Sequence, residues 1–263
     1  MKHPLSFAIL LLCFISLSCQ RANEQYITKT ATEDGYTYEY VTNDESNTRI
    51  YTLDTGLKVY LSVYKDAPRI FTFIPVKAGG KFDPANSTGL AHYLEHMMFK
   101  GTGQFGTKDW EQEKVMVDSI EQMFEYYRTL TDPEERKTWY AKIDQYSGEA
   151  AKLAIANEYD KMMAYIGAKG TNAYTTEDRT VYVNDIPANQ IDNFLQIESE
   201  RFSTIVNRLF HTELEAVYEE KNRSLDNDYW KVQETMMSSL FTSHPYGTQT
   251  VIGTIEHLKN PSI

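Results

Sequence analysis

The chain contains the pattern H-x-x-E-H in the run His92-Tyr93-Leu94-Glu95-His96, and this pattern limits the possible folds more than any other feature. On a helix, His92 and His96 lie one turn apart on the same face and can offer two imidazole nitrogens to one ion. Glu95 lies on the adjoining strip of that face. A glutamate there can accept a proton from water whose pKa a bound zinc ion lowers to about 7. The motif therefore predicts a helix, a zinc site and a general base.

The residues around the motif favour the same interpretation. Ser87 and Thr88 supply a capping hydroxyl just before the apolar positions of the motif, so we expect a helix to begin there. A zinc site of this kind needs a third protein ligand from elsewhere in the chain. The acidic, helix-favouring segment 210–222 offers several candidates, and its composition alone does not choose among them: Glu213, Glu215, Glu219 and Glu220.

Four stretches of the chain resemble the pitrilysin-type (M16) peptidases, a group of inverted-motif zinc enzymes that includes insulin-degrading enzyme and the mitochondrial processing peptidase. They are an opening strand at 52–59, the motif helix at 89–102, a substrate-side strand at 172–175 and a distal helix at 213–222. The resemblance implies an α+β fold, a metallohydrolase half in which a sheet packs against helices. The alternating residues 58–64 and the apolar residues 70–76 fit strands of such a sheet.

The resemblance also selects among the distal glutamates. In the family, this helix carries two glutamates seven residues apart, of which the second binds zinc and the first supports the site from behind. Glu213 and Glu220 match that spacing, which is nearly two helical turns. The resemblance thus implies one zinc ion per chain, bound by His92, His96 and Glu220, with Glu95 as the general base. We expect Glu215 and Glu219 on a solvated helix face.

The chain departs from the family between the motif and the distal helix, where it has additional residues. Residues 107–170 predict an inserted helical hairpin, in which a first helix ends near Thr131, Asp132 caps the next helix and Pro133 starts it. The apolar spacing predicts that this second helix continues to about Gly167. Such an arm could be a lid or a partner-docking element, or an insertion with its own core.

The residues after the hairpin mix β-branched, aromatic and polar types, as paired strands do. In the relatives, the corresponding strand presents a sheet edge beside zinc, and an extended substrate adds to it as a further strand. The resemblance therefore implies that Asn172 and Ala173 contact substrate. The alternative is an ordinary packed strand without substrate contact.

The first residues of the chain predict export. Residues 1–18 read as a signal peptide whose apolar part is too short to span a bilayer. The small residues before Cys19 resemble a bacterial lipobox, so we expect Cys19 to be acylated. This implies a lipoprotein of the periplasm or outer membrane, in the cell envelope of a Gram-negative-type bacterium, and soluble secretion is the alternative. Residues 19–45 are polar and predict a tether.

The predicted peptidase domain is 46–263, and we expect it to be incomplete at its C-terminus because it lacks the family's closing strands. The resemblance implies that a homologous C-terminal half, or a partner subunit, closes a chamber around a peptide or unfolded-protein substrate. The formal net charge is −11. This acidity disfavours nucleic acid as a partner, and a lipid anchor is the only membrane attachment we expect.

Together these features predict a zinc metalloendopeptidase that hydrolyses peptide bonds in peptides or small proteins. The alternative is a catalytically silent subunit of the same fold that binds peptides or a partner enzyme. The complete set of ligands and the presence of Glu95 favour the enzyme.

Overall fold

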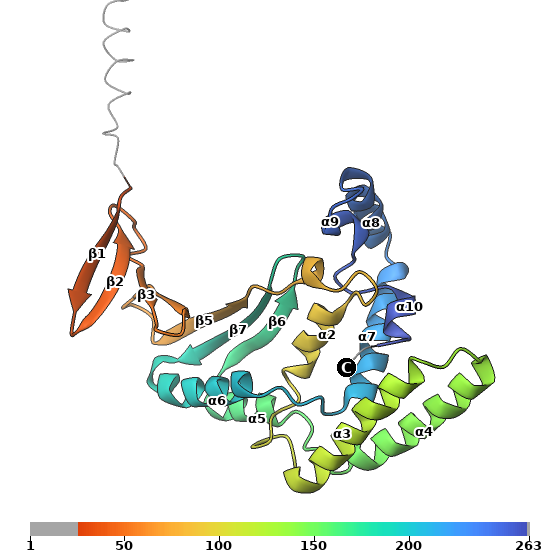
Figure 1. The fold of residues 1–263 in the computed structure, drawn as a ribbon. Helices are drawn as coiled ribbons and strands as arrows, with labels where there is room; N and C mark the ends of the chain where they lie inside the picture. Colours follow the sequence, from red (N-terminus) through yellow and green to blue (C-terminus); the bar gives the residue numbers. More distant parts are fainter. Residues whose placement is uncertain (1–25, 262–263) are drawn as a thin grey trace, which may run out of the picture. The chain divides into compact units, whose positions relative to one another are not determined.

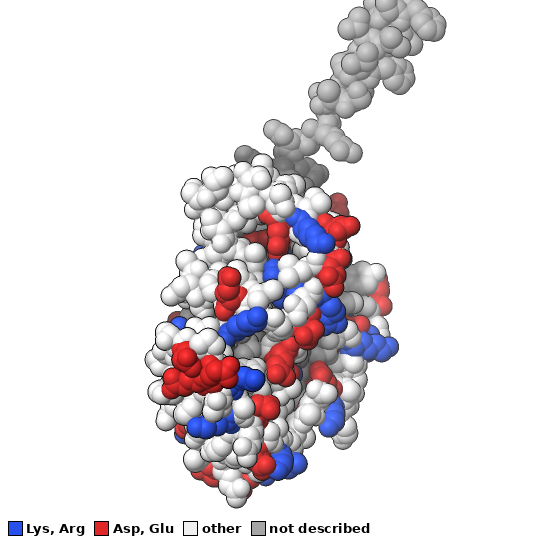
Figure 2. Space-filling model, turned by 90° about the vertical axis from the view of Figure 1, so that its right-hand side faces the viewer, with Lys and Arg blue, Asp and Glu red and all other residues white. Residues whose placement is uncertain are grey.

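The computed structural model describes residues 26–261, and the chain divides between Ala67 and Pro68 into two compact units. The predicted signal peptide, 1–18, and the predicted lipidation site, Cys19, lie outside the described residues. Among the residues described, no helix is both long and apolar enough to cross a membrane. Figure 2 shows lysine and arginine side chains interspersed with aspartate and glutamate on the face in view, without a continuous basic patch.

The first unit is a four-stranded antiparallel sheet in which each strand pairs with the next along the chain. Its strands are β1 (Thr28–Glu33), β2 (Tyr36–Val41), β3 (Arg49–Thr52) and β4 (Lys58–Leu61).

The predicted tether, 19–45, is therefore corrected, because its described part folds into the hairpin of β1 and β2. Asp34 and Gly35 both have positive φ angles, as a tight two-residue hairpin turn requires. Tyr38 on β2 then packs its ring 5.4 Å from that of Tyr51 on β3. The tyrosines that interrupt this polar segment thus serve as cross-strand contacts.

The second unit contains a three-stranded antiparallel sheet in the order β5-β7-β6 (Figure 1). Its strands are β5 (Arg69–Val76), β6 (Lys169–Thr175) and β7 (Thr180–Pro187). The central strand β7 is largely buried, as the apolar and β-branched residues at its start favour. In the described part of the chain, β6 has a strand partner on one side only.

Some helices of the second unit pack against this sheet, and others pack against one another. The longer ones are α2 (Leu90–Met97), α3 (Trp110–Tyr127), α4 (Pro133–Ala151), α5 (Glu158–Tyr165), α6 (Ile191–Ser203), α7 (Phe210–Leu225) and α8 (Asp228–Leu240). Short ones are η1 (Gly80–Phe82), η2 (Ala188–Gln190), α9 (Pro245–Thr248) and α10 (Ile255–Leu258). Helix α2 contacts both β6 and α7, so it links the sheet to the helical layer (Figure 1). This mixed arrangement is the α+β class that the sequence predicts.

The inserted arm is a hairpin of α3 and α4, each begun by an aspartate that caps the helix. The Asp132 side chain accepts from the Glu135 amide at 2.8 Å, and Pro133 follows at the first helical position. The prediction of one continuous second helix is wrong, because α4 ends at Ala151 and α5 begins at Glu158. Between them the chain pairs with residues 106–108, and these backbone bonds replace those of a helix.

The hairpin has no core of its own. Phe124 of α3 and Ile143 of α4 are fully buried in one apolar cluster with Met97 of α2 and Val217 of α7. The remaining members, buried or packed against this cluster, are Tyr93, Met116, Ile120, Met123, Tyr127, Leu130, Trp139, Tyr140, Tyr146, Ala150, Phe210, Leu214, Tyr218 and Leu258. Because the motif helix and the distal helix share this core, the arm helps to fix their relative positions.

Candidate metal centre

Helix α2, which carries the motif, begins in a different way from the predicted hydroxyl cap. Its N-cap is Gly89, whose φ of 93° favours glycine. The N-cap residue therefore supplies no side-chain hydrogen bond to the helix. The buried carboxylate of Asp83 instead accepts from the Gly89 amide at 2.7 Å and from the Ala91 amide at 3.0 Å. The Thr88 hydroxyl lies 2.7 Å from His257 Nδ1 on α10. The carboxylate of Asp83, several residues before the helix, thus accepts hydrogen bonds from amides at the start of α2.

The two histidines of the motif face the distal helix. Their rings are 4.9 Å apart and nearly perpendicular. His92 Nε2 lies 3.5 Å, and His96 Nε2 3.6 Å, from the same carboxylate oxygen of Glu220, Oε2. In the turn between the two histidines, the Tyr93 hydroxyl donates to the Phe210 carbonyl at 2.5 Å, which sets α2 against the start of α7. His92, His96 and Glu220 each offer one ligand atom, and these atoms lie within 4.8 Å of one another.

This triad fits a zinc ion. Zinc bonds of about 2.1 Å in tetrahedral geometry place ligand atoms roughly 3.4 Å apart, close to the two separations from Glu220. Burial, together with the neighbouring His96, lowers the pKa of His92 to about 4, so its imidazole is neutral near pH 7. The neutral imidazole is the form that binds a metal. Among the described histidine, cysteine, aspartate and glutamate residues, these three are the only group whose ligand atoms lie close enough together to hold one metal ion.

Glu213 lies behind His96, on the side away from Glu220. Its Oε2 is 3.3 Å from His96 Nδ1, and its Oε1 is 2.6 Å from Lys100 Nζ. Burial alone would raise the pKa of Glu213, but hydrogen bonds from His96 and Lys100 outweigh burial and lower it. Burial alone would likewise lower the pKa of His96, but the hydrogen bond to Glu213 and the nearby carboxylates raise it.

Glu95 is buried beside the triad and holds one hydrogen bond from the sheet. The Thr175 hydroxyl on β6 donates to Glu95 Oε2 at 2.6 Å. Burial raises the pKa of Glu95, and the bond from Thr175 partly offsets that rise. A carboxylate with a raised pKa is better matched to accepting and returning a proton near neutral pH.

The structure separates the two residues expected to contact substrate. On β6, Ala173 and Thr175 share the face toward α2, since the Thr175 hydroxyl bonds Glu95. Asn172 is one residue away, exposed, and belongs to the opposite face of the sheet. Any contact that Asn172 makes on the α2 face must therefore come from its backbone.

Glu215 and Glu219 are exposed on α7, and the structure brings neither of them to the triad.

Three residues at this centre escaped the sequence reasoning. Thr175 could have been found from strand alternation, because it lies two residues after Ala173 on the same face. Lys100 follows the motif helix by one turn, a spacing that brings it back to the side of His96. Asp83 gives no local signal, since its role depends on how residues 83–89 turn before the helix.

Two solved structures share the fold of this chain. The crystal structure of a protease from Helicobacter pylori superposes with a TM-score of 0.58 and 21% identity, covering 81% of this chain and 40% of that chain. Pitrilysin superposes with a TM-score of 0.55 and 18% identity, covering 89% of this chain and 20% of that chain. At these identities the likeness establishes the fold: a sheet with helices of the pitrilysin type.

Sequence comparison gives the family. The model described as Insulinase (Peptidase family M16) matches residues 62–145, which include the motif. The A-factor-processing enzyme of Saccharomyces cerevisiae is 25% identical over 77% of this chain and 15% of its own length. A probable mitochondrial-processing peptidase subunit beta of Arabidopsis thaliana is 33% identical over 36% of this chain and 17% of its own length.

The chain thus resembles the N-terminal domain of peptidase family M16, the insulinase family, whose model matches residues 62–145. It spans less than a fifth of the length of the curated relatives it matches.

Proposed function

We propose that this chain contributes the metal site of a zinc metalloendopeptidase. The observation that carries the proposal is the meeting of His92 Nε2 and His96 Nε2 at one oxygen of Glu220, at 3.5 and 3.6 Å, with the buried Glu95 in the same helix turn. These three residues would hold the ion and leave a fourth position open, as catalytic zinc sites do. Bound zinc would supply Lewis acidity and lower the pKa of water to about 7.

Residues of the chain would transfer the proton and orient the side chains at the site. Glu95 accepts the proton of the attacking water and returns it to the departing amine of the cleaved peptide bond. Thr175 holds one oxygen of Glu95, which leaves the other oxygen to exchange the proton. Glu213 accepts a hydrogen bond from the Nδ1–H of His96 and thereby directs Nε2 of that histidine toward the ion.

We further propose that the substrate is an extended peptide added along β6. In the described chain, this strand pairs only with β7, so its outer backbone groups remain available for a further strand. Main-chain bonding of this kind accepts many sequences, and it uses Asn172 through its backbone while Ala173 faces α2. A peptide there would lie beside the motif helix, because α2 contacts β6.

A second, homologous half or a partner subunit is proposed to close over the substrate, since this chain covers 40% of the Helicobacter pylori protease and 20% of pitrilysin. The export signal and the anchor at Cys19 are proposed to place the protein in the cell envelope. Both proposals concern parts outside the described structure.

The decisive experiment measures zinc bound per chain in the wild type, Glu220→Gln and Glu219→Gln. We expect one zinc in the wild type and in Glu219→Gln, whose changed residue is exposed on the same helix, and a loss in Glu220→Gln. Glu95→Gln should retain zinc and lose peptide cleavage. Equal zinc in the wild type and Glu220→Gln would refute the assigned ligand, and no zinc in a folded wild type would refute the site.

A further inference from the structure

Lys100, just beyond the motif helix, lies close to the candidate metal centre but outside the triad. Its Nζ is 2.6 Å from Glu213 Oε1, and the two side chains are only 18% and 13% exposed. The other oxygen of the same carboxylate is 3.3 Å from His96 Nδ1. Lys100 and His96 therefore occupy different oxygens of one glutamate.

This division of the carboxylate has a consequence for His96. An ionised carboxylate only accepts hydrogen bonds, so a bond between Glu213 Oε2 and His96 Nδ1 requires the proton to be on Nδ1. In the neutral ring, the lone pair is then on Nε2, the nitrogen that faces Glu220 at 3.6 Å. If Glu213 turned away, nothing at this contact would favour that tautomer.

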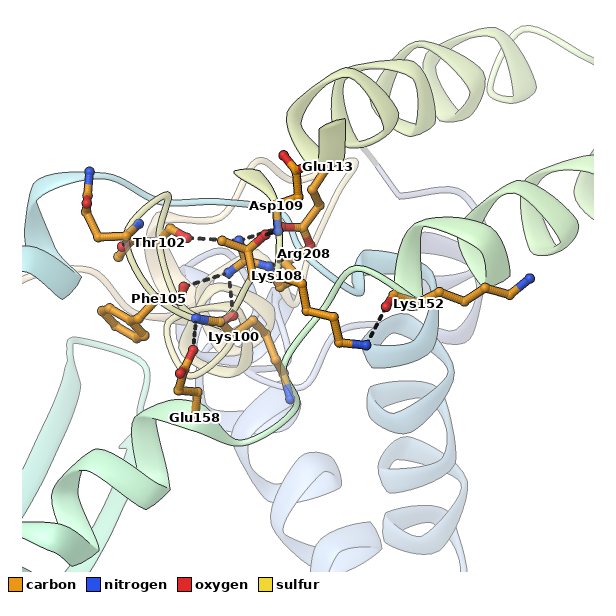
Figure 3. A network of polar contacts seen from close by, with 12 residues as sticks. Lys100, Thr102, Phe105, Lys108, Asp109, Glu113, Lys152, Glu158 and Arg208 are labelled. Atoms are coloured by element: carbon orange, nitrogen blue, oxygen red, sulfur yellow. Dashed lines mark hydrogen bonds and ion pairs between the residues drawn. The ribbon is translucent and has the colours of Figure 1, made fainter. Parts of the chain in front are cut away.

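The backbone of Lys100 is held in place from behind (Figure 3). Arg208 Nη1 donates to the Lys100 carbonyl at 2.8 Å, and the same guanidinium donates to the carbonyls of Thr102 and Phe105. Glu113 of α3 accepts two bonds from Arg208, at 2.7 and 2.8 Å, and both side chains are 1% exposed. A charge network this deeply buried fixes the loop from which Lys100 projects.

The ion pair of Lys100 and Glu213 is therefore unlike a surface ion pair. Surface pairs contribute little because both side chains move freely in water. Lys152 and Glu149 form such a pair at 2.6 Å, with side chains 68% and 57% exposed. Because Glu213 and Lys100 are both largely buried, loss of the Lys100 cation would be costly. It would also leave the Glu213 carboxylate without the contact that fixes its orientation.

We propose that Lys100 is a positioning residue for the metal centre: by holding Glu213 Oε1 it presents Oε2 to His96 Nδ1 and so directs Nε2 toward the ion. This deepens the proposed function and relies on it for the identity of the ion. The tautomer of His96, however, can be measured in the metal-free chain and does not depend on the identity of the ion.

The first test records the ring nitrogen shifts of His96 by NMR in the metal-free full chain, at a pH where His96 is neutral. The wild type and Lys100→Arg should carry the proton on Nδ1, and Lys100→Met should show a mixture or the other tautomer. Lys152→Met, which removes the exposed pair, should match the wild type. Should Lys100→Met fail to fold, Lys100→Gln replaces it. An unchanged tautomer in the folded neutral variant would overturn the proposal.

The second test titrates zinc alone into the same chains against a competing chelator. We expect about 10- to 100-fold weaker binding in Lys100→Met, the range typical for loss of a partner that orients a ligand, and near wild-type binding in Lys100→Arg. Equal affinity in all chains would contradict the role of Lys100. Zinc retained by Glu220→Gln would refute the proposed ligand set instead. The tautomer measurement would still test whether Lys100 orients Glu213 toward His96.

Discussion

Glu95 lies beside the candidate metal centre with one of its two oxygens already bound by Thr175. The motif and the family resemblance predicted the positions of His92, His96 and Glu220, because helical spacing brings residues at i and i+4 together and the resemblance chose among the glutamates. They also predicted that Glu213 supports the site, but not that Thr175 contacts Glu95 or that Lys100 contacts Glu213. Such contacts join residues distant in the chain, and a sequence pattern records no pairing of that kind.

Removing the hydroxyl of Thr175 should change the acidity of Glu95. The hydroxyl stabilises the charged carboxylate, so Thr175→Val should raise the pKa of Glu95 further above its ordinary value. An NMR titration of the metal-free chain with labelled glutamate carboxyl carbons would measure the change. Thr235→Val, which removes a hydroxyl bonded within α8, is the control and should leave Glu95 unaffected. An unchanged pKa in Thr175→Val would contradict the contact.

At the scale of elements, periodicity and helix-start signals predicted the motif helix α2, the hairpin of α3 and α4, and the strands β4 and β5. Helix α4 begins where Asp132 and Pro133 indicated. Two predictions failed because tertiary pairing outweighed local preference. Residues 152–157 leave the helix to pair with 106–108, and the polar segment before residue 45 folds as strands through cross-strand tyrosine contacts.

The start of α2 provides a test at this scale. Asp83→Ala removes the acceptor of the N-cap amide of Gly89 and of the first-turn amide of Ala91, and should lower the free energy of unfolding by about 1–2 kcal/mol, as loss of a helix cap does. Chemical denaturation of the metal-free chain would measure the loss. Asp118→Ala, at an exposed position within α3, is the matched control and should change stability by less than about 0.5 kcal/mol. Equal effects of both substitutions would rule out capping by Asp83.

At the scale of the whole molecule, the candidate metal centre joins segments that are far apart in sequence. Helix α2 supplies His92 and His96, and α7 supplies Glu220 from beyond the inserted hairpin. An ion held there would bind the folded chain and not the unfolded one, and so would stabilise the fold.

Chelation should therefore lower the thermal midpoint of the wild type. Zinc at a hundredfold excess over its dissociation constant stabilises by about 2.7 kcal/mol, which corresponds to roughly 5–10 °C for a domain of this size. Differential scanning calorimetry with zinc and with chelator would measure the difference. In Glu220→Gln the two scans should nearly coincide, and an equally large shift in that variant would assign the stabilisation to another zinc site.

The ion pair of Arg208 and Glu113 determines whether the inserted arm could be removed without destabilising the rest of the chain. The arm supplies the only carboxylate that this guanidinium contacts among residues 26–261, and it does so at 1% exposure. Trimming the arm to a short linker would strand a cation in the interior, at a cost of about 3–5 kcal/mol. Loss of the arm during evolution would thus require a compensating change at Arg208, so the two should be gained or lost together.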